Sequence, residues 1–476
     1  RNRGSNISGS CMTFRKINRV HFVGIGGIGM SGIAELLLNL GFTVTGSDVK
    51  KSDNVQRLVN LGIDVHIGHD PVNVGETDVL VYSSAVQSEN PEIIKARQKG
   101  IPIIRRAEML GELISVKETS IAVGGTHGKT TTSSMIGTVL SHGKMDPTLV
   151  VGGLVQNLDT NSKLGDGNII VVEADEFDRS FLALKPTIGV ITNIELEHTD
   201  CYEDLPDLQD AFLQFCQSVP FYGEVIVCAD SPGIRDIIPK IERPMTTYGR
   251  SRDAAYRAKN LRFDATQSTY SVFRAEENLG DIQINVPGEH NVLNSLAAVV
   301  IGLEMGLSFS LIQTGIKTYN GVRRRFDIKG CYHNIMVVDD YAHHPTEIDA
   351  TLEAAKGGWD RRIIAVFQPH LFTRTQAFFR EFAAALKKAD VVFITDIYPA
   401  REKPIPGITA ELIYNECKNT GMDQCYFIPD LDNLVKELDQ IVQPNDLVLT
   451  LGAGSIWRYS EAYARHLEQN VTEVKG

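Results

Sequence analysis

A phosphate-binding loop is predicted at residues 125–131, which read Gly125-Thr126-His127-Gly128-Lys129-Thr130-Thr131. This segment follows the apolar run 121–123 and precedes a stretch, 131–140, that is predicted to be helical. A glycine loop between a strand and a helix presents backbone N–H groups and the positive end of the helix dipole to an anion. Lys129 would add a positive charge beside the β- and γ-phosphates, and the Thr130 hydroxyl would bind Mg²⁺. The segment therefore predicts a nucleoside triphosphate site.

The spacing of this loop differs from the common nucleotide-binding pattern GxxxxGK[ST]. That pattern requires a glycine at position 123, where this chain has Val123. The glycines at 125 and 128 instead define a shorter loop. We therefore expect a protein that binds a nucleoside triphosphate without being a common ATPase or GTPase.

A second glycine loop lies near the start of the chain and matches the pattern GxGxxG. Its glycines are Gly24, Gly26, Gly27 and Gly29, and Asp48 follows at the end of the next predicted strand. Such glycines allow a tight turn and close approach to a diphosphate, and the acid suits a ribose hydroxyl. From the residues alone, three readings stay open: NAD(P) or FAD, another nucleotide diphosphate, and tight packing without a ligand.

Acidic residues and a histidine follow two further predicted strands. Glu173 comes directly after the apolar run 169–172, and His198 ends the sequence that follows the strand 188–192. Polar side chains at the carboxyl ends of parallel strands lie at the edge of the sheet where ligands bind. We expect Glu173 to bind one metal ion and His198 to bind a second. The alternatives are a solvated acidic turn and a surface or core histidine.

Other polar residues are placed where they could contact a nucleotide or a second substrate. Asn291 and Asn294 share one face of a predicted helix, where their amides could read an adenine edge or cap the helix. Arg325 lies in a run of three arginines. These side chains either lie on a solvated surface or bring a positive charge to the γ-phosphate. Three more residues follow predicted strands at strand-to-helix crevices: Asp340, His344 and Arg374.

Bulk composition limits the classes of protein to which the chain can belong. Its 476 residues are too many for one core, so about two to four domains are expected. The formal net charge of −12 argues against a nucleic-acid partner. No stretch reaches about 18 uncharged apolar residues, so no membrane insertion is expected. Seven cysteines without a CxxC pair suit reduced thiols and a cytoplasmic protein. Residues 1–11 are expected to be an expression remnant before a native Met12.

Strand and helix signals alternate along the chain, which predicts an α/β protein with three domains built on parallel sheets. Residues 12–117 are expected to form a Rossmann-like N-terminal domain and 118–322 a central, P-loop-type ATP-binding α/β domain. Residues 323–476 are expected to form a Rossmann-like C-terminal domain. Short alternating runs between 245 and 287 predict a small antiparallel patch in the central domain.

Taken together and in this order, the motifs resemble those of the Mur ligase family over residues 12–470. They are GIGGIGMSGIA at 24–34, GTHGKTT at 125–131, EADEFD at 173–178, NIELEH at 193–198, GEHNVLN at 288–294, RRRFD at 323–327, DDYAHHPTE at 339–347 and GAGSI at 452–456. Any one of them could arise by chance, whereas their joint order is highly specific.

This resemblance implies an ATP-dependent ligase of peptidoglycan synthesis. Within the family it favours the branch that joins L-alanine to the lactyl carboxylate of UDP-N-acetylmuramate through an acyl phosphate, giving ADP and phosphate. The first glycine loop would then hold a UDP-sugar, not a redox cofactor. ATP and two Mg²⁺ ions are the implied cofactors, and the protein would be a monomer or a homodimer.

The resemblance also implies roles for individual residues. The implied UDP-sugar residues are Gly24, Gly26, Gly27, Gly29 and Asp48. The implied ATP residues are those of the loop 125–131 with Asn291, Asn294, Arg325 and Asp340. The implied Mg²⁺ ligands are Thr130, Glu173 and His198. Catalytic roles are implied for Lys129, His198, Arg325 and His344, and amino-acid binding for His344 and Arg374.

Two features depart from the family pattern. Ligases that add later residues carry a carbamylated lysine at the second metal, and no motif here supplies one. Phe177 stands where a small residue such as serine is expected. Three rivals remain at this point: a nicotinamide dehydrogenase based on the first glycine loop, a motor or regulatory P-loop ATPase, and a related ligase that attaches a recycled tripeptide or folate glutamates.

Overall fold

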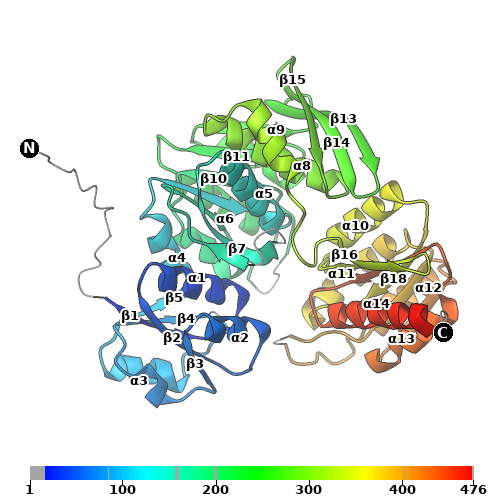
Figure 1. Cartoon of the computed structure of the whole chain (residues 1–476), viewed down its shortest axis with the longest axis horizontal. Coiled ribbons are helices and arrows are strands. Elements are labelled where there is room, and N and C mark those ends of the chain that lie inside the picture. Colours follow the sequence, from blue (N-terminus) through cyan, green and yellow to red (C-terminus); the bar gives the residue numbers. More distant parts are fainter. Residues whose placement is uncertain (1–16, 84, 156–159, 198–200, 401, 474–476) are drawn as a thin grey trace, which may run out of the picture. The chain divides into compact units, whose positions relative to one another are not determined.

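The computed structural model describes residues 17–473 except 84, 156–159, 198–200 and 401 (Figure 1). The chain divides near residue 113 into two compact units, of which the first contains one sheet and the second contains two. Helices accompany all three sheets, so the predicted three-part α/β architecture is confirmed. Among the described residues, no helix is long and apolar enough to cross a membrane.

The first unit is built on a five-stranded parallel sheet, drawn in blue in Figure 1. Its strands, in spatial order, are β3 (Asp64–Ile67), β2 (Thr43–Asp48), β1 (Arg19–Val23), β4 (Val79–Tyr82) and β5 (Ile103–Arg105). The helices are α1 (Ile28–Asn39), α2 (Asp53–Asn60), α3 (Pro91–Gln98) and α4 (Arg106–Ile114), with a 3₁₀ turn, η1 (Pro71–Val74). The strand order reverses at β1, and this is the point where doubly wound sheets bind ligands.

The first glycine loop connects β1 to α1, as the sequence predicts. Gly24 has a φ of +80°, and a Cβ atom on Gly26 would lie 2.7 Å from the Val55 side chain. The N–H group of Gly26 donates to Asp48 Oδ2 at 2.8 Å. Asp48, the predicted ribose ligand, therefore holds the loop backbone in this structure.

A buried carboxylate organises the same edge of the sheet. Glu92, at the start of α3, accepts hydrogen bonds from Ser47 Oγ at 2.6 Å and Asn73 Nδ2 at 2.7 Å, and lies 3.2 Å from His21 Nε2. The carbonyl of Ser47 in turn accepts the N–H groups of Gly24 and Ile25. Glu92 thus fixes the strand end on which the glycine loop rests.

The central sheet of the second unit has ten strands. In spatial order they are β15 (Glu277–Ile284), β14 (Gln267–Arg274), β13 (Tyr256–Asp264), β12 (Met245–Gly249), β11 (Glu224–Cys228), β10 (Ile188–Ile191), β6 (Thr119–Gly124), β9 (Ile169–Glu173), β7 (Thr148–Val155) and β8 (Thr160–Lys163). The run from β13 to β15 is antiparallel, so the predicted patch exists. Helices α5 (Lys129–His142) and α8 (Glu289–Glu304) pack against each other beside the parallel part.

Further helices and 3₁₀ turns complete the central part of the second unit. They are α6 (Leu205–Ser218), α7 (Pro232–Arg235), α9 (Phe309–Lys317), and the 3₁₀ turns η2 (Phe177–Ala183) and η3 (Ile238–Lys240). The Phe212 and Phe215 side chains of α6 are fully buried and contact Phe181 of η2. This contact secures the acidic segment that follows β9.

The third sheet has six strands with apolar cores on both faces. In order they are β16 (Asp327–Tyr332), β17 (Ile335–Asp340), β21 (Asp446–Leu451), β18 (Arg362–Phe367), β19 (Val391–Thr395) and β20 (Cys425–Ile428), with β16 antiparallel. Its helices are α10 (Pro345–Gly358), α11 (Phe372–Leu386), α12 (Glu411–Asn419), α13 (Leu434–Ile441) and α14 (Ile456–Glu473), and the 3₁₀ turn is η4 (Leu431–Asn433). The carboxyl ends of β17 and β18 lead directly into α10 and α11.

The Glu92 network predicts an acid-sensitive first unit. Burial alone would raise the Glu92 pKa, but hydrogen bonds from His21, Ser47 and Asn73 outweigh it and lower the pKa from 4.5 to about 2. Because the folded pKa is depressed, the stabilisation is present above pH 4.5 and is lost as pH falls toward 2. We expect Glu92 to contribute about 3 kcal/mol to the free energy of unfolding at neutral pH.

Urea unfolding of the full chain between pH 3 and 7 measures this contribution. Glu92→Gln should lower the free energy of unfolding at pH 7, and this free energy should vary less with pH than it does in the wild type. The exposed residue Glu89 gives the matched control, Glu89→Gln. Equal pH profiles for wild type and Glu92→Gln would contradict the assignment.

Candidate functional site

The second glycine loop joins β6 to the first turn of α5, which confirms the predicted strand–loop–helix arrangement. Gly125 and Gly128 have φ values of +132° and +82°. A Cβ atom on Gly125 would lie 2.1 Å from Thr192 Oγ1, and one on Gly128 would lie 2.6 Å from Asn294 Oδ1. Only glycine suits either position, because both the backbone angle and the available space exclude a side chain.

Lys129 occupies the first position of α5 and turns back toward the loop. Its Nζ atom donates to the Gly125 carbonyl at 2.7 Å and to both carboxylate oxygens of Glu176, at 2.7 and 3.0 Å. Burial alone would lower the Lys129 pKa, but Glu176 and Asp175 raise it above its ordinary value. The lysine is therefore cationic at neutral pH, and an anionic ligand would replace Glu176 as its partner.

Glu173 lies at the carboxyl end of β9, beside the phosphate loop. Its Oε1 atom accepts the Gly152 N–H at 2.6 Å, and the Thr130 side chain acts to lower the Glu173 pKa. Burial raises the Glu173 pKa, so a nearby cation would stabilise the charged form. A carboxylate and a hydroxyl are the oxygen ligands that Mg²⁺ prefers, so Thr130 and Glu173 fit the predicted metal site. His198, the third predicted ligand, lies outside the described residues.

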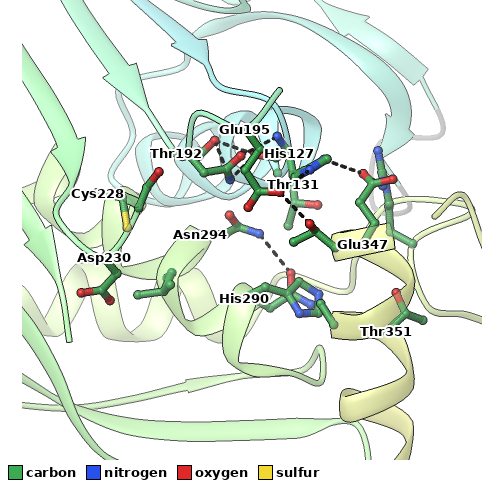
Figure 2. A pocket seen from close by; sticks show the side chains of 18 of the residues that line it. His127, Thr131, Thr192, Glu195, Cys228, Asp230, His290, Asn294, Glu347 and Thr351 are labelled. Atoms are coloured by element: carbon green, nitrogen blue, oxygen red, sulfur yellow. Dashed lines mark hydrogen bonds and ion pairs between the residues drawn. The ribbon is translucent and has the colours of Figure 1, made fainter. Parts of the chain in front are cut away.

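A cavity of about 280 Å³ lies next to the phosphate loop, within the second unit (Figure 2). Cys228 and Asp230 lie across it from Glu347 and Thr351 of α10. The cavity brings together seven of the predicted ATP residues: His127, Gly128, Thr131, Asn291, Asn294, Arg325 and Asp340. The predicted residues Lys129, Thr130 and Glu173 lie in or beside the same loop but do not line the cavity, and neither do His344 and Arg374.

The two asparagines of α8 form a chain of amide hydrogen bonds that ends at Thr132 of α5, just beyond the phosphate loop. Asn291 Nδ2 donates to the Pro287 carbonyl at 2.7 Å, and Asn294 Nδ2 donates to Asn291 Oδ1 at 3.3 Å. Asn294 Oδ1 accepts from Thr132 Oγ1 at 3.1 Å. Since the N-cap of α8 is Gly288, the helix-capping alternative for these asparagines is excluded.

Asp340 holds the turn that carries Arg325. Its two carboxylate oxygens accept the backbone N–H groups of Phe326 and Ala342, each at 2.7 Å. Burial raises the Asp340 pKa to about 6, although Arg325 and these hydrogen bonds counteract the shift. The Arg325 guanidinium lies 5.2 Å from the Tyr341 ring centroid and 3.4 Å from Glu347.

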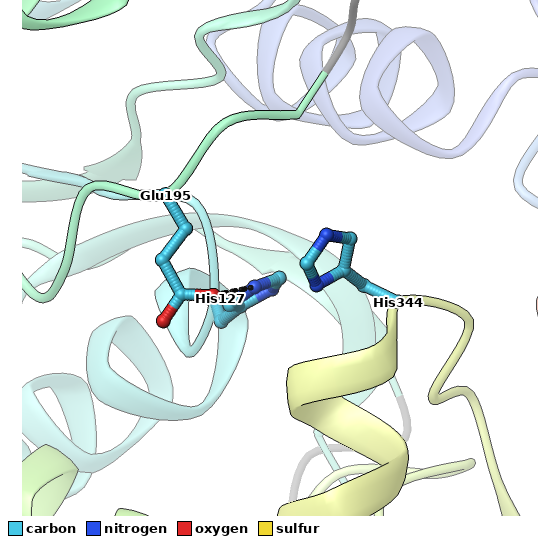
Figure 3. Close-up of side chains that lie close together, drawn as sticks. All are labelled: His127, Glu195 and His344. Carbon is cyan, nitrogen blue, oxygen red and sulfur yellow. Dashed lines mark ion pairs between the residues drawn. The ribbon is translucent and has the colours of Figure 1, made fainter. Parts of the chain in front are cut away.

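Two histidines and a glutamate meet where the phosphate loop approaches α10 (Figure 3). His127 Nε2 lies 3.5 Å from Glu195 Oε2, and the rings of His127 and His344 lie 4.9 Å apart between centroids. His344 caps α10 through Nδ1, which accepts the Thr346 N–H at 3.4 Å. An accepting Nδ1 assigns the proton of a neutral His344 to Nε2, and this buried atom has no hydrogen-bond partner. The ring therefore offers a donor to a ligand oxygen, which disfavours metal binding at this atom.

The predicted amino-acid ligand Arg374 already has a carboxylate partner. Its Nη2 atom donates to Glu197 Oε1 at 2.6 Å, both side chains are buried, and Nη1 lies 3.1 Å from His370 Nδ1. Desolvating two charges is costly, so the close pairing is what makes their burial possible. A substrate carboxylate would compete with Glu197 for this guanidinium.

Four acidic site residues were missed by sequence reasoning: Glu176, Glu195, Glu197 and Glu347. Glu176 pairs with Lys129, Glu197 pairs with Arg374, and Glu195 and Glu347 both lie beside His127. All four belong to motifs on which the family resemblance rests. The available signal was charge balance, because a buried lysine or arginine requires a counter-charge.

Comparison with known proteins gives concordant matches along the chain. The family models described as Mur ligase family, catalytic domain, Mur ligase middle domain, and Mur ligase, glutamate ligase domain match residues 19–118, 123–302 and 324–454. The UDP-N-acetylmuramate–L-alanine ligases of Geotalea daltonii and Geotalea uraniireducens are 49% and 50% identical to the chain, over 96% of it and 99% of each relative. The crystal structure of UDP-N-acetylmuramate-alanine ligase from Thermotoga maritima aligns with a TM-score of 0.82 at 30% identity, covering 95% of this chain and 99% of that one.

At neutral pH, His127 should be protonated and His344 should be neutral. Burial alone would lower the His127 pKa, but Glu195 and Glu347 raise it to about 10, whereas burial and the nearby His127 charge lower the His344 pKa to about 4. The raised His127 pKa gives stabilisation that is complete below about pH 6.5 and is lost as pH rises through 10.

Long-range ¹H–¹⁵N spectra of the histidine side chains measure both states. At pH 7 we expect an imidazolium pattern for His127 and a neutral pattern with the proton on Nε2 for His344. His127→Gln and His344→Gln assign the two signals. A neutral His127 at pH 7 would contradict the inferred charge arrangement.

Proposed function

The chain belongs to the Mur ligase family, and from this premise we propose that it joins L-alanine to the lactyl carboxylate of UDP-N-acetylmuramate at the expense of ATP. The observation that carries this proposal is the phosphate loop with Lys129 and Glu173, set beside a cavity lined by residues of both sheets of the second unit. The reaction would serve peptidoglycan synthesis, as the resemblance to the Mur ligase family implies.

The three parts of the chain would divide the substrates among them. Residues 12–117 would bind the UDP-sugar through the loop 24–29, and residues 118–322 would bind ATP. Residues 323–476 would bind the amino acid and complete the ATP site. The support is the placement of each loop at the carboxyl edge of its sheet, where such folds bind ligands.

ATP is needed because an amine does not displace hydroxide from a carboxylate at a useful rate near neutral pH. In the first step the lactyl carboxylate attacks the γ-phosphorus in line and ADP leaves, which gives an acyl phosphate. Lys129 and Arg325 would neutralise the charge that grows on the phosphoryl oxygens. Mg²⁺ held by Thr130 and Glu173, with His198 proposed for a second ion, would add further charge neutralisation when bound.

In the second step the neutral amine of alanine attacks the acyl carbon, the nitrogen gives up a proton to solvent, and phosphate leaves from the tetrahedral intermediate. Arg374 would bind the alanine carboxylate in exchange with Glu197. The Nε2–H group of His344, which lacks a partner in this structure, would donate to a substrate oxygen nearby. Exclusion of water from the acyl phosphate would protect it from hydrolysis.

Phosphate release tests the proposed function against its rivals. With ATP, Mg²⁺ and UDP-N-acetylmuramate we expect release that depends on the added amino acid, with L-alanine best in a panel that includes serine and glycine. Release without the UDP-sugar would favour a motor or regulatory ATPase. An absorbance change of added nicotinamide cofactor would favour a dehydrogenase, and dependence on a tripeptide or on glutamate would favour a related ligase.

Replacing Lys129 tests the role of the loop. Because a cationic contact to the transition state is worth several kcal/mol, Lys129→Ala should lower kcat by about 10²-fold or more. Lys144→Ala, which removes a lysine that follows α5, is the matched control and should keep wild-type turnover. Steady-state ADP formation measures both variants, and near-normal turnover of Lys129→Ala would overturn the assigned role.

A further inference from the structure

We propose that Glu347 is a positioning residue that aims Arg325 at the transferred phosphoryl group by tying it to the phosphate loop. This inference rests on the proposed function and adds a positioning residue to it. Glu347 lies in the first turn of α10 and lines the nucleotide cavity (Figure 2).

The two oxygens of this carboxylate face different partners. Oε2 contacts His343, which lies just before α10. It accepts the backbone N–H of His343 at 3.0 Å and lies 3.1 Å from His343 Nδ1. Oε1 faces away from α10, at 3.3 Å from His127 Nδ1 and 3.4 Å from Arg325 Nη1. One oxygen atom therefore links the phosphate loop to the arginine that is proposed to reach the γ-phosphate.

The three linked side chains come from two different parts of the second unit. His127 belongs to the loop between β6 and α5, whereas Arg325 lies just before β16 and Glu347 follows β17. The carboxylate thus joins the part built on the central sheet to the part built on the third sheet. A second contact reinforces it, since Thr346 Oγ1 donates to Glu195 Oε2 at 2.6 Å.

Charge and burial favour this arrangement over a simple helix-capping role. The Glu347 side chain is 10% exposed, so its charge needs compensation, and His127, His343 and Arg325 all approach it. A glutamate at this position usually accepts the N–H of the N-cap residue, which is His344 here. Glu347 instead accepts the N–H of His343 and directs its other oxygen across the cavity. The reach across the cavity is more than helix capping requires.

Without this carboxylate, the Arg325 guanidinium would keep its neighbours Tyr341 and Asp340 but lose its link to His127. Its distance from the phosphate loop would then no longer be fixed. Misplacement of a transition-state cation by about 1 Å can cost about 10²-fold in rate. The loss should therefore appear mainly in kcat, with smaller changes in substrate binding.

Four variants test the proposal by phosphate release in the full chain. Glu347→Gln keeps the shape and removes the charge, and Glu347→Asp keeps the charge on a shorter side chain. His127→Gln and the double variant His127→Gln/Glu347→Gln measure coupling between the two partners. Glu353→Gln is the matched control, because Glu353 lies on the same helix, is 59% exposed and pairs with Lys388.

We expect Glu347→Gln to lower kcat by about 10- to 100-fold, with KM for the UDP-sugar within about twofold of wild type. Glu347→Asp should fall between Glu347→Gln and wild type, and Glu353→Gln should match wild type. The double variant should lose less than the product of the two single losses. Thermal unfolding of each variant reports on folding, and if Glu347→Gln does not fold, the kcat of Glu347→Asp decides.

Wild-type kcat in a folded Glu347→Gln, or fully multiplicative losses in the double variant, would overturn the proposal. Failure of the proposed function would look different, because the wild-type protein itself would then show no release dependent on the UDP-sugar and L-alanine. In that case, long-range ¹H–¹⁵N spectra of the histidine side chains in wild type and Glu347→Gln still test the link through its contact with His127. An unchanged His127 signal in Glu347→Gln would overturn it.

Discussion

Thr192 beyond β10 and Asn294 of α8 approach the phosphate loop so closely that no Cβ atom fits at Gly125 or Gly128. This steric limit governs the rest of the site. It brings the Asn294 amide against the backbone of the loop and places Lys129 at the first position of α5. Because β10, β6 and β9 are neighbours in one sheet, the same approach brings Glu173 and the segment after β10 to a common edge.

Charge pairing is the second principle of this edge. Lys129 pairs with Glu176, Arg374 with Glu197, and Arg325 with Glu347. Each of the predicted anion-binding cations therefore pairs with a protein carboxylate. The carboxylates keep buried cations charged, and a substrate anion at these cations would bind by exchange with a carboxylate. Its affinity would then reflect the difference between two ion pairs, which is smaller than the energy of either one.

Much of this arrangement could be predicted from the sequence, because local patterns determine it. The order of strand, glycine loop and helix predicted the positions of both loops. The apolar run 188–192 predicted a strand that agrees with β10 to within one residue. Short or polar strands such as β3, β8 and β20 escaped prediction, because four residues carry little periodicity and their pairing depends on neighbours distant in sequence.

The predicted site residues fall into the same two groups. Gly128, Asn291 and Asn294 come together because α5, which follows the phosphate loop, and α8 pack side by side. The partners Glu176, Glu197 and Glu347 could not be chosen among the neighbouring acids. Which acid turns inward depends on backbone details such as the positive φ of Asp178 and Arg179, and on contacts across the cavity.

Val123, the residue that breaks the common phosphate-loop pattern, is fully buried in β6 and pairs with both Val190 and Glu173. The strand continues through the position where other loops have already begun, so the loop offers fewer backbone N–H groups to a phosphate. Side chains from distant segments must supply the missing contacts. The ability to hold a nucleotide is therefore distributed over the whole second unit, and a fragment that contained the loop alone would lack it.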